Sequence, residues 1–130
     1  LYGQIAYAIV MQKRGGHFVL KIFDCFMAHT TDLLALLSSL YEKVYITKPQ
    51  TSRIANSEKY IVCKNYIGPH CDVIYPNLKI CFQSLLSYKK NPFRFINIPL
   101  SLFFVTKLEE YNSIFGQQQI SHFIFILLLF

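Results

Sequence analysis

The chain has 130 residues, which is room for one compact domain, and 53% of them are hydrophobic while only 15% are charged. This apolar balance, with a mean hydropathy of +0.32, excludes an intrinsically disordered protein. The formal net charge of +6 suits a polyanionic partner, although many proteins without such a partner are equally basic.

The first part of the chain predicts two helices and a buried strand. Residues 2–13 carry apolar side chains at helical spacing, and Gly15 and Gly16 are typical of a helix end. Residues 17–23 form a nearly unbroken apolar run, which indicates a strand buried on both faces of a sheet. A second helix is expected over residues 33–41, with its cap at Thr30, Thr31 or Asp32.

Two more strands follow. Residues 43–47 predict a strand that Pro49 ends, because proline has no backbone donor for the ladder. A polar loop over residues 50–57 leads to a third strand over residues 58–64. The helix–strand–helix–strand order predicts right-handed crossovers and parallel strands. The loop at residues 50–57 is too short for another crossover, so the third strand should run antiparallel to the second.

The second half of the chain predicts mainly helices, near residues 78–88 and 100–115, with another from Gln117. The apolar run Phe123 to Phe130 is far shorter than the roughly 20 residues that span a bilayer. We therefore expect it to pack as a helix against the rest of the chain, and we expect no membrane partner.

The cysteines favour a reducing compartment over a metal site. Cys25, Cys63, Cys71 and Cys81 contain no C-x-x-C pair, and His70 beside Cys71 would chelate poorly as an immediate neighbour. We expect buried free thiols and no bound metal. The sequence shows no secretory signal, so the protein is expected to be intracellular and not secreted.

Two charged residues stand out in the strand region. Lys21 lies within an apolar strand, where an unpaired ammonium costs several kcal/mol, unless its side chain reaches solvent from the strand end. Glu58 opens the third strand, where a carboxylate can simply be solvated. If the third strand lies antiparallel beside the first, however, the two residues meet at the carboxyl edge of the sheet. Open α/β sheets bind their ligands at that edge.

The run from Gly15 to Tyr66 resembles the FtsJ-like ribose 2′-O-methyltransferases. The family motif Gly-Gly-x-Phe-Val-x-Lys-x-Phe is matched by Gly15, Gly16, Phe18, Val19, Lys21 and Phe23. The motif Lys-Pro-x-x-Ser-Arg is matched by Lys48, Pro49, Ser52 and Arg53. The motif around the last strand is matched by Glu58, Tyr60, Val62 and Cys63. Residues 107–120 are similar to the C-terminal extensions of this family in large DNA viruses.

The resemblance implies methyl transfer from S-adenosylmethionine to an RNA ribose hydroxyl, at cap-proximal mRNA nucleotides if the viral similarity holds. The family uses a Lys-Asp-Lys-Glu tetrad on a Rossmann-like seven-stranded sheet, and Lys21 and Glu58 match its third and fourth members as catalytic residues. The first Lys, the Asp and the glycine-rich cofactor loop are expected upstream of Leu1. S-adenosylmethionine is therefore expected to bind mainly to that part, and the 130-residue chain alone is expected to be inactive.

The residue types fit this chemistry. A ribose hydroxyl is a weak acid, so its attack on a sulfonium methyl group needs a general base or strong polarisation. A lysine serves as a base only where burial and a neighbouring cation bring its pKa towards neutrality. Lys48, Ser52 and Arg53 lie on the loop beside the same edge and are expected to contact RNA phosphate or ribose. The alternative for Arg53 is an ion pair with an acid of its own domain.

Together these patterns predict an α/β fold with parallel strands and one antiparallel strand, which the family resemblance identifies as the C-terminal part of a Rossmann-like methyltransferase sheet. Residues 1–66 are expected to form the C-terminal half of the methyltransferase domain, and residues 67–130 a mainly helical extension. The alternative function is a catalytically inactive methyltransferase-like module that binds RNA or acts as a scaffold. A partly decayed reading frame is a third interpretation. The expected location is the cytoplasm, and a viral replication compartment or a virion is the alternative.

Overall fold

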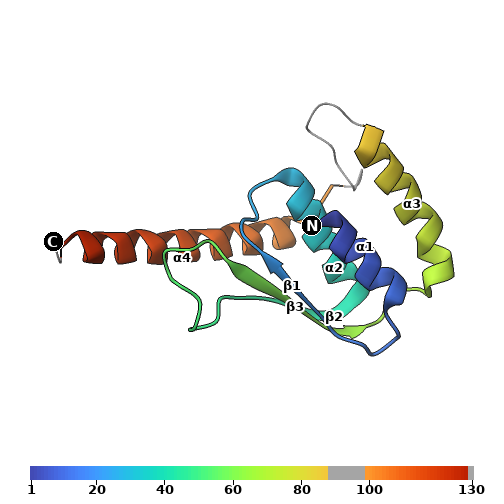
Figure 1. Cartoon of the computed structure of the whole chain (residues 1–130), viewed down its shortest axis with the longest axis horizontal. Helices are drawn as coiled ribbons and strands as arrows, with labels where there is room; N and C mark the ends of the chain where they lie inside the picture. Colours follow the sequence, from blue (N-terminus) through green and yellow to red (C-terminus); the bar gives the residue numbers. More distant parts are fainter. Residues whose placement is uncertain (88–98, 129–130) are drawn as a thin grey trace.

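The computed structural model describes residues 1–87 and 99–128 (Figure 1). Within these residues the elements follow one another in chain order as α1 (Tyr2–Met11), β1 (Phe18–Ile22), α2 (Ala28–Leu40), β2 (Tyr41–Thr47), β3 (Lys59–Tyr66), α3 (Cys71–Ser87) and α4 (Leu102–Leu127).

The sheet has the strand order β1-β3-β2, and β3 pairs antiparallel with both of its neighbours. The prediction that the third strand runs antiparallel to the second is therefore confirmed, and so is its place beside the first. Because β1 and β2 are both antiparallel to β3, they point in the same direction without pairing. The described residues thus contain no hydrogen-bonded parallel pair, unlike the sheet predicted from the element order.

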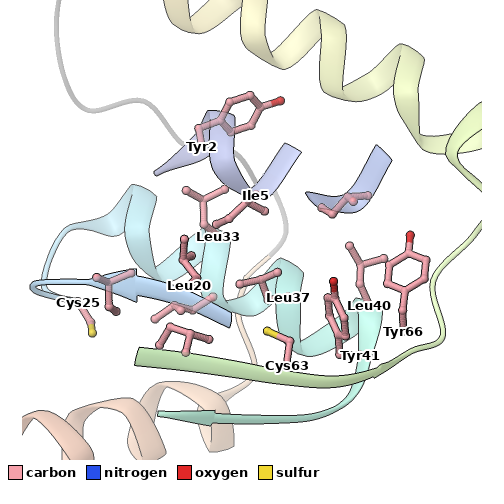
Figure 2. Packing of buried hydrophobic residues seen from close by; sticks show 14 of the residues in the cluster. Tyr2, Ile5, Leu20, Cys25, Leu33, Leu37, Leu40, Tyr41, Cys63 and Tyr66 are labelled. Atoms are coloured by element: carbon pink, nitrogen blue, oxygen red, sulfur yellow. The ribbon is translucent and has the colours of Figure 1, made fainter. Parts of the chain in front are cut away.

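Helices α1 and α2 cover one face of this sheet (Figure 1). Figure 2 shows Ile5 of α1 and Leu33 and Leu37 of α2 above Leu20 of β1 and Cys63 of β3. These side chains are all buried and form the centre of the core. The amphipathic helices therefore bury their apolar faces against alternate strand residues, as the pleat requires.

Strand β1 is buried on one face only, so the prediction that both faces are covered is wrong. Leu20 and Ile22 point into the core, whereas Val19 is 59% exposed and Lys21 is exposed as well. Among the described residues, no second layer covers the side of β1 that Val19 and Lys21 occupy. An unbroken apolar run predicts burial on both faces, but only packed neighbours can supply it.

Helix α2 begins at Ala28, earlier than predicted, so the expected cap residues lie inside it. The hydroxyl of Thr31 donates a hydrogen bond to the carbonyl oxygen of Met27, at 3.2 Å, instead of capping a backbone N–H group. Thr30 and Asp32 are buried within the first turns. A threonine hydroxyl can bond back to the preceding turn, which makes threonine compatible with a helix interior as well as with a cap.

The C-terminal helices also differ from the prediction. Helix α3 begins at Cys71 and packs on α1, where the Tyr2 hydroxyl donates a hydrogen bond to the Leu78 carbonyl oxygen at 2.7 Å. Residue 88, the predicted end of this helix, lies outside the described residues. Helix α4 is continuous through Gly116, instead of two helices that meet there. A single glycine in a helix costs only about 1 kcal/mol, so it need not end one.

The outer part of α4 extends beyond the sheet (Figure 1). Residues 123–127 are helical as predicted, but Phe123, Phe125 and Leu127 are exposed, so the expected packing of this run is wrong; residues 129–130 lie outside the described residues. Neither α4 nor any other helix within residues 1–87 and 99–128 combines the length and apolarity that crossing a membrane requires.

Candidate active site

Lys21 and Glu58 meet at the edge of the sheet, as the sequence predicts. Lys21 of β1 is directly opposite Tyr60 of β3, and Glu58 precedes β3 by one residue. Because strand side chains alternate, Glu58 and Tyr60 lie on the same face as Lys21. The Lys21 ammonium nitrogen is 3.2 Å from Glu58 Oε2. The side chains are 48% and 17% exposed respectively, so the pair opens to solvent and is accessible to a substrate.

The Glu58 carboxylate is held by further hydrogen bonds. The Tyr60 hydroxyl donates to Glu58 Oε1 at 2.5 Å, and the Asn56 amide donates to Oε2 at 3.4 Å. The Glu58 backbone N–H donates to Asn56 Oδ1 at 2.9 Å, which ties the loop to the strand start. The carboxylate is therefore fixed in place before it meets any ligand.

These contacts set the charge of the site. The hydrogen bond from Tyr60 and then that from Lys21 lower the pKa of Glu58, with the nearby positive charges adding to the effect and partial burial opposing it. The hydrogen bond to Glu58 raises the pKa of Tyr60 in turn. The carboxyl group is thus a stable anion at neutral pH. Asn56 and Tyr60 were not predicted as site residues, although period-two spacing from Glu58 placed Tyr60 on the same face.

Lys48 is directed into its own loop. Its ammonium donates to the carbonyl oxygens of Asn56 and, at 2.9 Å, Glu58, and to the Ser52 hydroxyl at 3.2 Å. Burial is the main cause that lowers the Lys48 pKa, and the Glu58 charge opposes it. All three ammonium hydrogens of Lys48 have an acceptor. Lys48 and Ser52 therefore lie together, and their hydrogen bonds hold the loop against the backbone of Glu58.

Arg53 lies at the exposed outer side of the same loop. It lines a small pocket of about 300 Å³ together with Thr51, Glu58 and Tyr60. Within residues 1–87 and 99–128 its guanidinium makes no ion pair, so the alternative of a structural partner finds no support there. The guanidinium is therefore available near the Lys21–Glu58 pair for an anionic ligand.

Lys59, the residue after Glu58, points to the opposite face and is only 5% exposed. Its ammonium lies 5.4 Å from the ring centroid of Phe115, 5.6 Å from that of Tyr111 and 6.0 Å from that of Phe26. Aromatic faces attract a cation at such distances. Because Tyr111 and Phe115 belong to α4, this contact holds α4 against the strand that follows Glu58.

The glycines of the first motif do not form a cofactor loop. Gly15 N–H donates to the Tyr66 carbonyl oxygen at 3.0 Å, and Tyr66 N–H donates to the Gly16 carbonyl oxygen at 2.9 Å. These bonds extend the β1–β3 ladder at the end of β1 away from Lys21. Gly15 has φ +81°, which explains a glycine at this turn. Gly15 and Gly16 are therefore used to join β1 and β3, and the Lys21–Glu58 pair is the part of the described residues that could activate a hydroxyl.

A family profile for FtsJ-like methyltransferases matches residues 1–66, and the chain belongs to this family. The sequence resemblance is thereby confirmed. Methyltransferases of this family use S-adenosylmethionine as methyl donor.

The relatives share a more specific name. The cap-specific mRNA (nucleoside-2′-O-)-methyltransferase 1 of Trypanosoma brucei brucei is 48% identical over 68 residues, which are 52% of this chain and 18% of that protein. The mouse protein of the same name is 48% identical over 61 residues, 47% of this chain and 7% of that protein. The zebrafish protein is 37% identical over 91 residues, 70% of this chain and 10% of that protein. The chain thus spans less than a fifth of the length of these relatives.

Proposed function

We propose that the protein is an RNA ribose 2′-O-methyltransferase that acts on cap-proximal nucleotides of mRNA, with Lys21 and Glu58 as catalytic residues. The observation that carries the proposal is the 3.2 Å contact between Lys21 and Glu58, at two motif positions that lie 37 residues apart in the sequence. Family membership and the name shared by the relatives support the reaction and the substrate class.

The residues of the chain then have distinct tasks. When bound, S-adenosylmethionine supplies an electrophilic methyl group. With its ammonium paired to Glu58, Lys21 polarises the ribose hydroxyl by a hydrogen bond to its oxygen. It takes up the hydroxyl proton when the first lysine of the tetrad, expected outside this chain, adds a second positive charge beside it. Glu58 holds the Lys21 nitrogen in place, and Tyr60 and Asn56 prevent the carboxylate from turning away. Orienting the hydroxyl in this way also contributes to the rate.

The loop at residues 48–58 contributes to RNA binding. Arg53 supplies a charge-assisted contact to a phosphate beside the methylated ribose. Lys48 acts differently from what its sequence position suggests, because its ammonium already has three acceptors in the loop. It therefore serves RNA binding through the shape of the loop. The half-buried Ser52 accepts a hydrogen bond from Lys48, and its hydroxyl hydrogen can still be donated to the RNA.

The remaining assignments follow the same scheme. Residues 1–66 form part of the methyltransferase domain, and residues 67–130 form a helical extension. S-adenosylmethionine is bound mainly by protein outside this chain, because the glycines present here are used in the sheet. The reaction takes place in the cytoplasm, where capped mRNA is a substrate. The similarity of residues 107–120 to viral forms stays a prediction.

A chimera tests this function. Residues 1–66 replace the matching segment of the Trypanosoma brucei relative, and transfer of labelled methyl groups to capped RNA is measured. Thermal unfolding and S-adenosylmethionine binding establish that the chimera is folded. We expect methylation that is lost on Lys21→Ala. A folded chimera that binds the cofactor but transfers no methyl group would contradict the proposal and favour the inactive RNA-binding module.

A further inference from the structure

A groove of about 1170 Å³ lies between α4 and the loop that follows β2. Ile114, Gln118 and His122 recur at helical spacing and present one face of α4 to it, and Gln50 and Ser52 line it from the loop. The volume exceeds the roughly 300–1,000 Å³ that is typical of small-molecule pockets. The groove therefore suits an extended ligand.

Both walls of the groove are tied to the candidate active site. The loop wall is held in place by Lys48, whose ammonium donates a hydrogen bond to the carbonyl oxygen of Glu58 at 2.9 Å. The helix wall is held by the buried ammonium of Lys59, which lies against the rings of Tyr111 and Phe115. Ser52 lines this groove and also the small pocket that contains Glu58. A ligand that reaches Glu58 can therefore continue along α4.

The lining indicates the chemistry of the occupant. None of the described residues that line the groove is acidic, and the chain as a whole carries a net charge of +6. Glutamine amides from both walls offer donors and acceptors of the kind that pair with base edges, while Ile114 and Phe115 supply apolar surface beside them. A neutral polar lining without carboxylates does not repel a nucleic acid strand, and the phosphates of such a strand can stay partly solvated.

We propose that this groove binds single-stranded RNA next to the methylated nucleotide, with α4 as one wall. The inference rests on the proposed function for the identity of the RNA, but it concerns a helix that lies outside the residues matched by the family profile. Its role is to extend the contact beyond the reacting ribose, so that the RNA is held at several points.

Two matched substitutions on α4 test the groove in the 130-residue chain. Ile114 lines the groove and is 51% exposed, whereas Ile120 is 55% exposed, does not line the groove and lies on another side of the helix. Ile114→Glu and Ile120→Glu add the same charge at similarly exposed positions. Affinity is measured by the fluorescence anisotropy of a labelled single-stranded RNA of about ten nucleotides, within the usual size of single-strand sites. Circular dichroism checks that both variants keep their helices.

We expect Ile114→Glu to weaken RNA binding by about tenfold at moderate salt, because a carboxylate placed in the groove repels the polyanionic RNA, while Ile120→Glu changes it less than about twofold. Equal losses of RNA affinity in both variants, or an unchanged affinity in both, would overturn the proposal. The groove would then be a candidate site for a protein partner. Absence of RNA binding by the unmodified chain would overturn it as well. The methylation chimera carries only residues 1–66 and lacks α4, so its failure and the failure of this test are distinguishable.

Discussion

Substitutions of Lys21 distinguish a catalytic role from a structural one, because the two roles predict different effects on activity and on stability. Its side chain is 48% exposed and makes one ion pair, and exposed pairs contribute little to folding stability. In the methylation chimera, Lys21→Ala should therefore change the unfolding midpoint by less than about 3 °C. Glu58 keeps its hydrogen bonds from Tyr60 and Asn56 in this variant, so the rest of the site stays in place.

The same substitution should reduce methyl transfer by about 10²–10⁴-fold, the usual loss when a general base is removed. Lys21→Arg retains the pair with Glu58 but holds its proton at any working pH, so it should be nearly as inactive if Lys21 is the base. Lys43→Ala, an exposed lysine on β2, is the matched control and should keep full activity.

The assay is the pH–rate profile under saturating S-adenosylmethionine and capped RNA, because saturation removes effects on binding. Near wild-type turnover by Lys21→Arg would refute the role of Lys21 as general base. Lys21 would then act only through its positive charge. A large drop in the unfolding midpoint of Lys21→Ala would refute the structural premise, because the lysine would then hold the fold together.

Three other substitutions test neighbouring parts of the structure. Arg53→Ala should weaken RNA binding and reduce its salt dependence while sparing the maximal rate; an unchanged salt dependence would remove Arg53 from the RNA contact. Tyr60→Phe should raise the pKa of Glu58, measurable by NMR titration, since the Tyr60 hydrogen bond is the main cause of its lowering. The stability that wild type gains from the lowered pKa of Glu58 is present above about pH 4.3 and is lost as the pH falls through the folded pKa, so the two proteins should converge in acid. Tyr111→Phe should raise the unfolding midpoint by a few degrees, because the buried Tyr111 hydroxyl has no hydrogen-bond partner among the described residues and its burial costs about 1–3 kcal/mol. A lower midpoint for that variant would mean that the hydroxyl has a partner.

Local patterns in the sequence were enough to find the strands and the central pair of the site. The short apolar runs placed β1, β2 and β3 within two residues of their observed bounds. The length of the loop at residues 50–57 predicted that the third strand runs antiparallel to the second. The contact of Lys21 with Glu58 followed from the further condition that this strand lies beside the first, and the family resemblance indicated the same two residues. The strand positions and the antiparallel turn needed only the geometry of neighbouring elements, which residue spacing encodes.

The tertiary structure alone decided which side chains are free to act. Lys48 looked available for RNA, yet carbonyl oxygens eight and ten residues away take up its ammonium. The place of α4 beside the site depends on contacts between the Lys59 ammonium and the rings of Tyr111 and Phe115, which are more than fifty residues further along the chain. Such contacts leave no periodic trace in the sequence, because they arise only when distant elements pack and exclude water together.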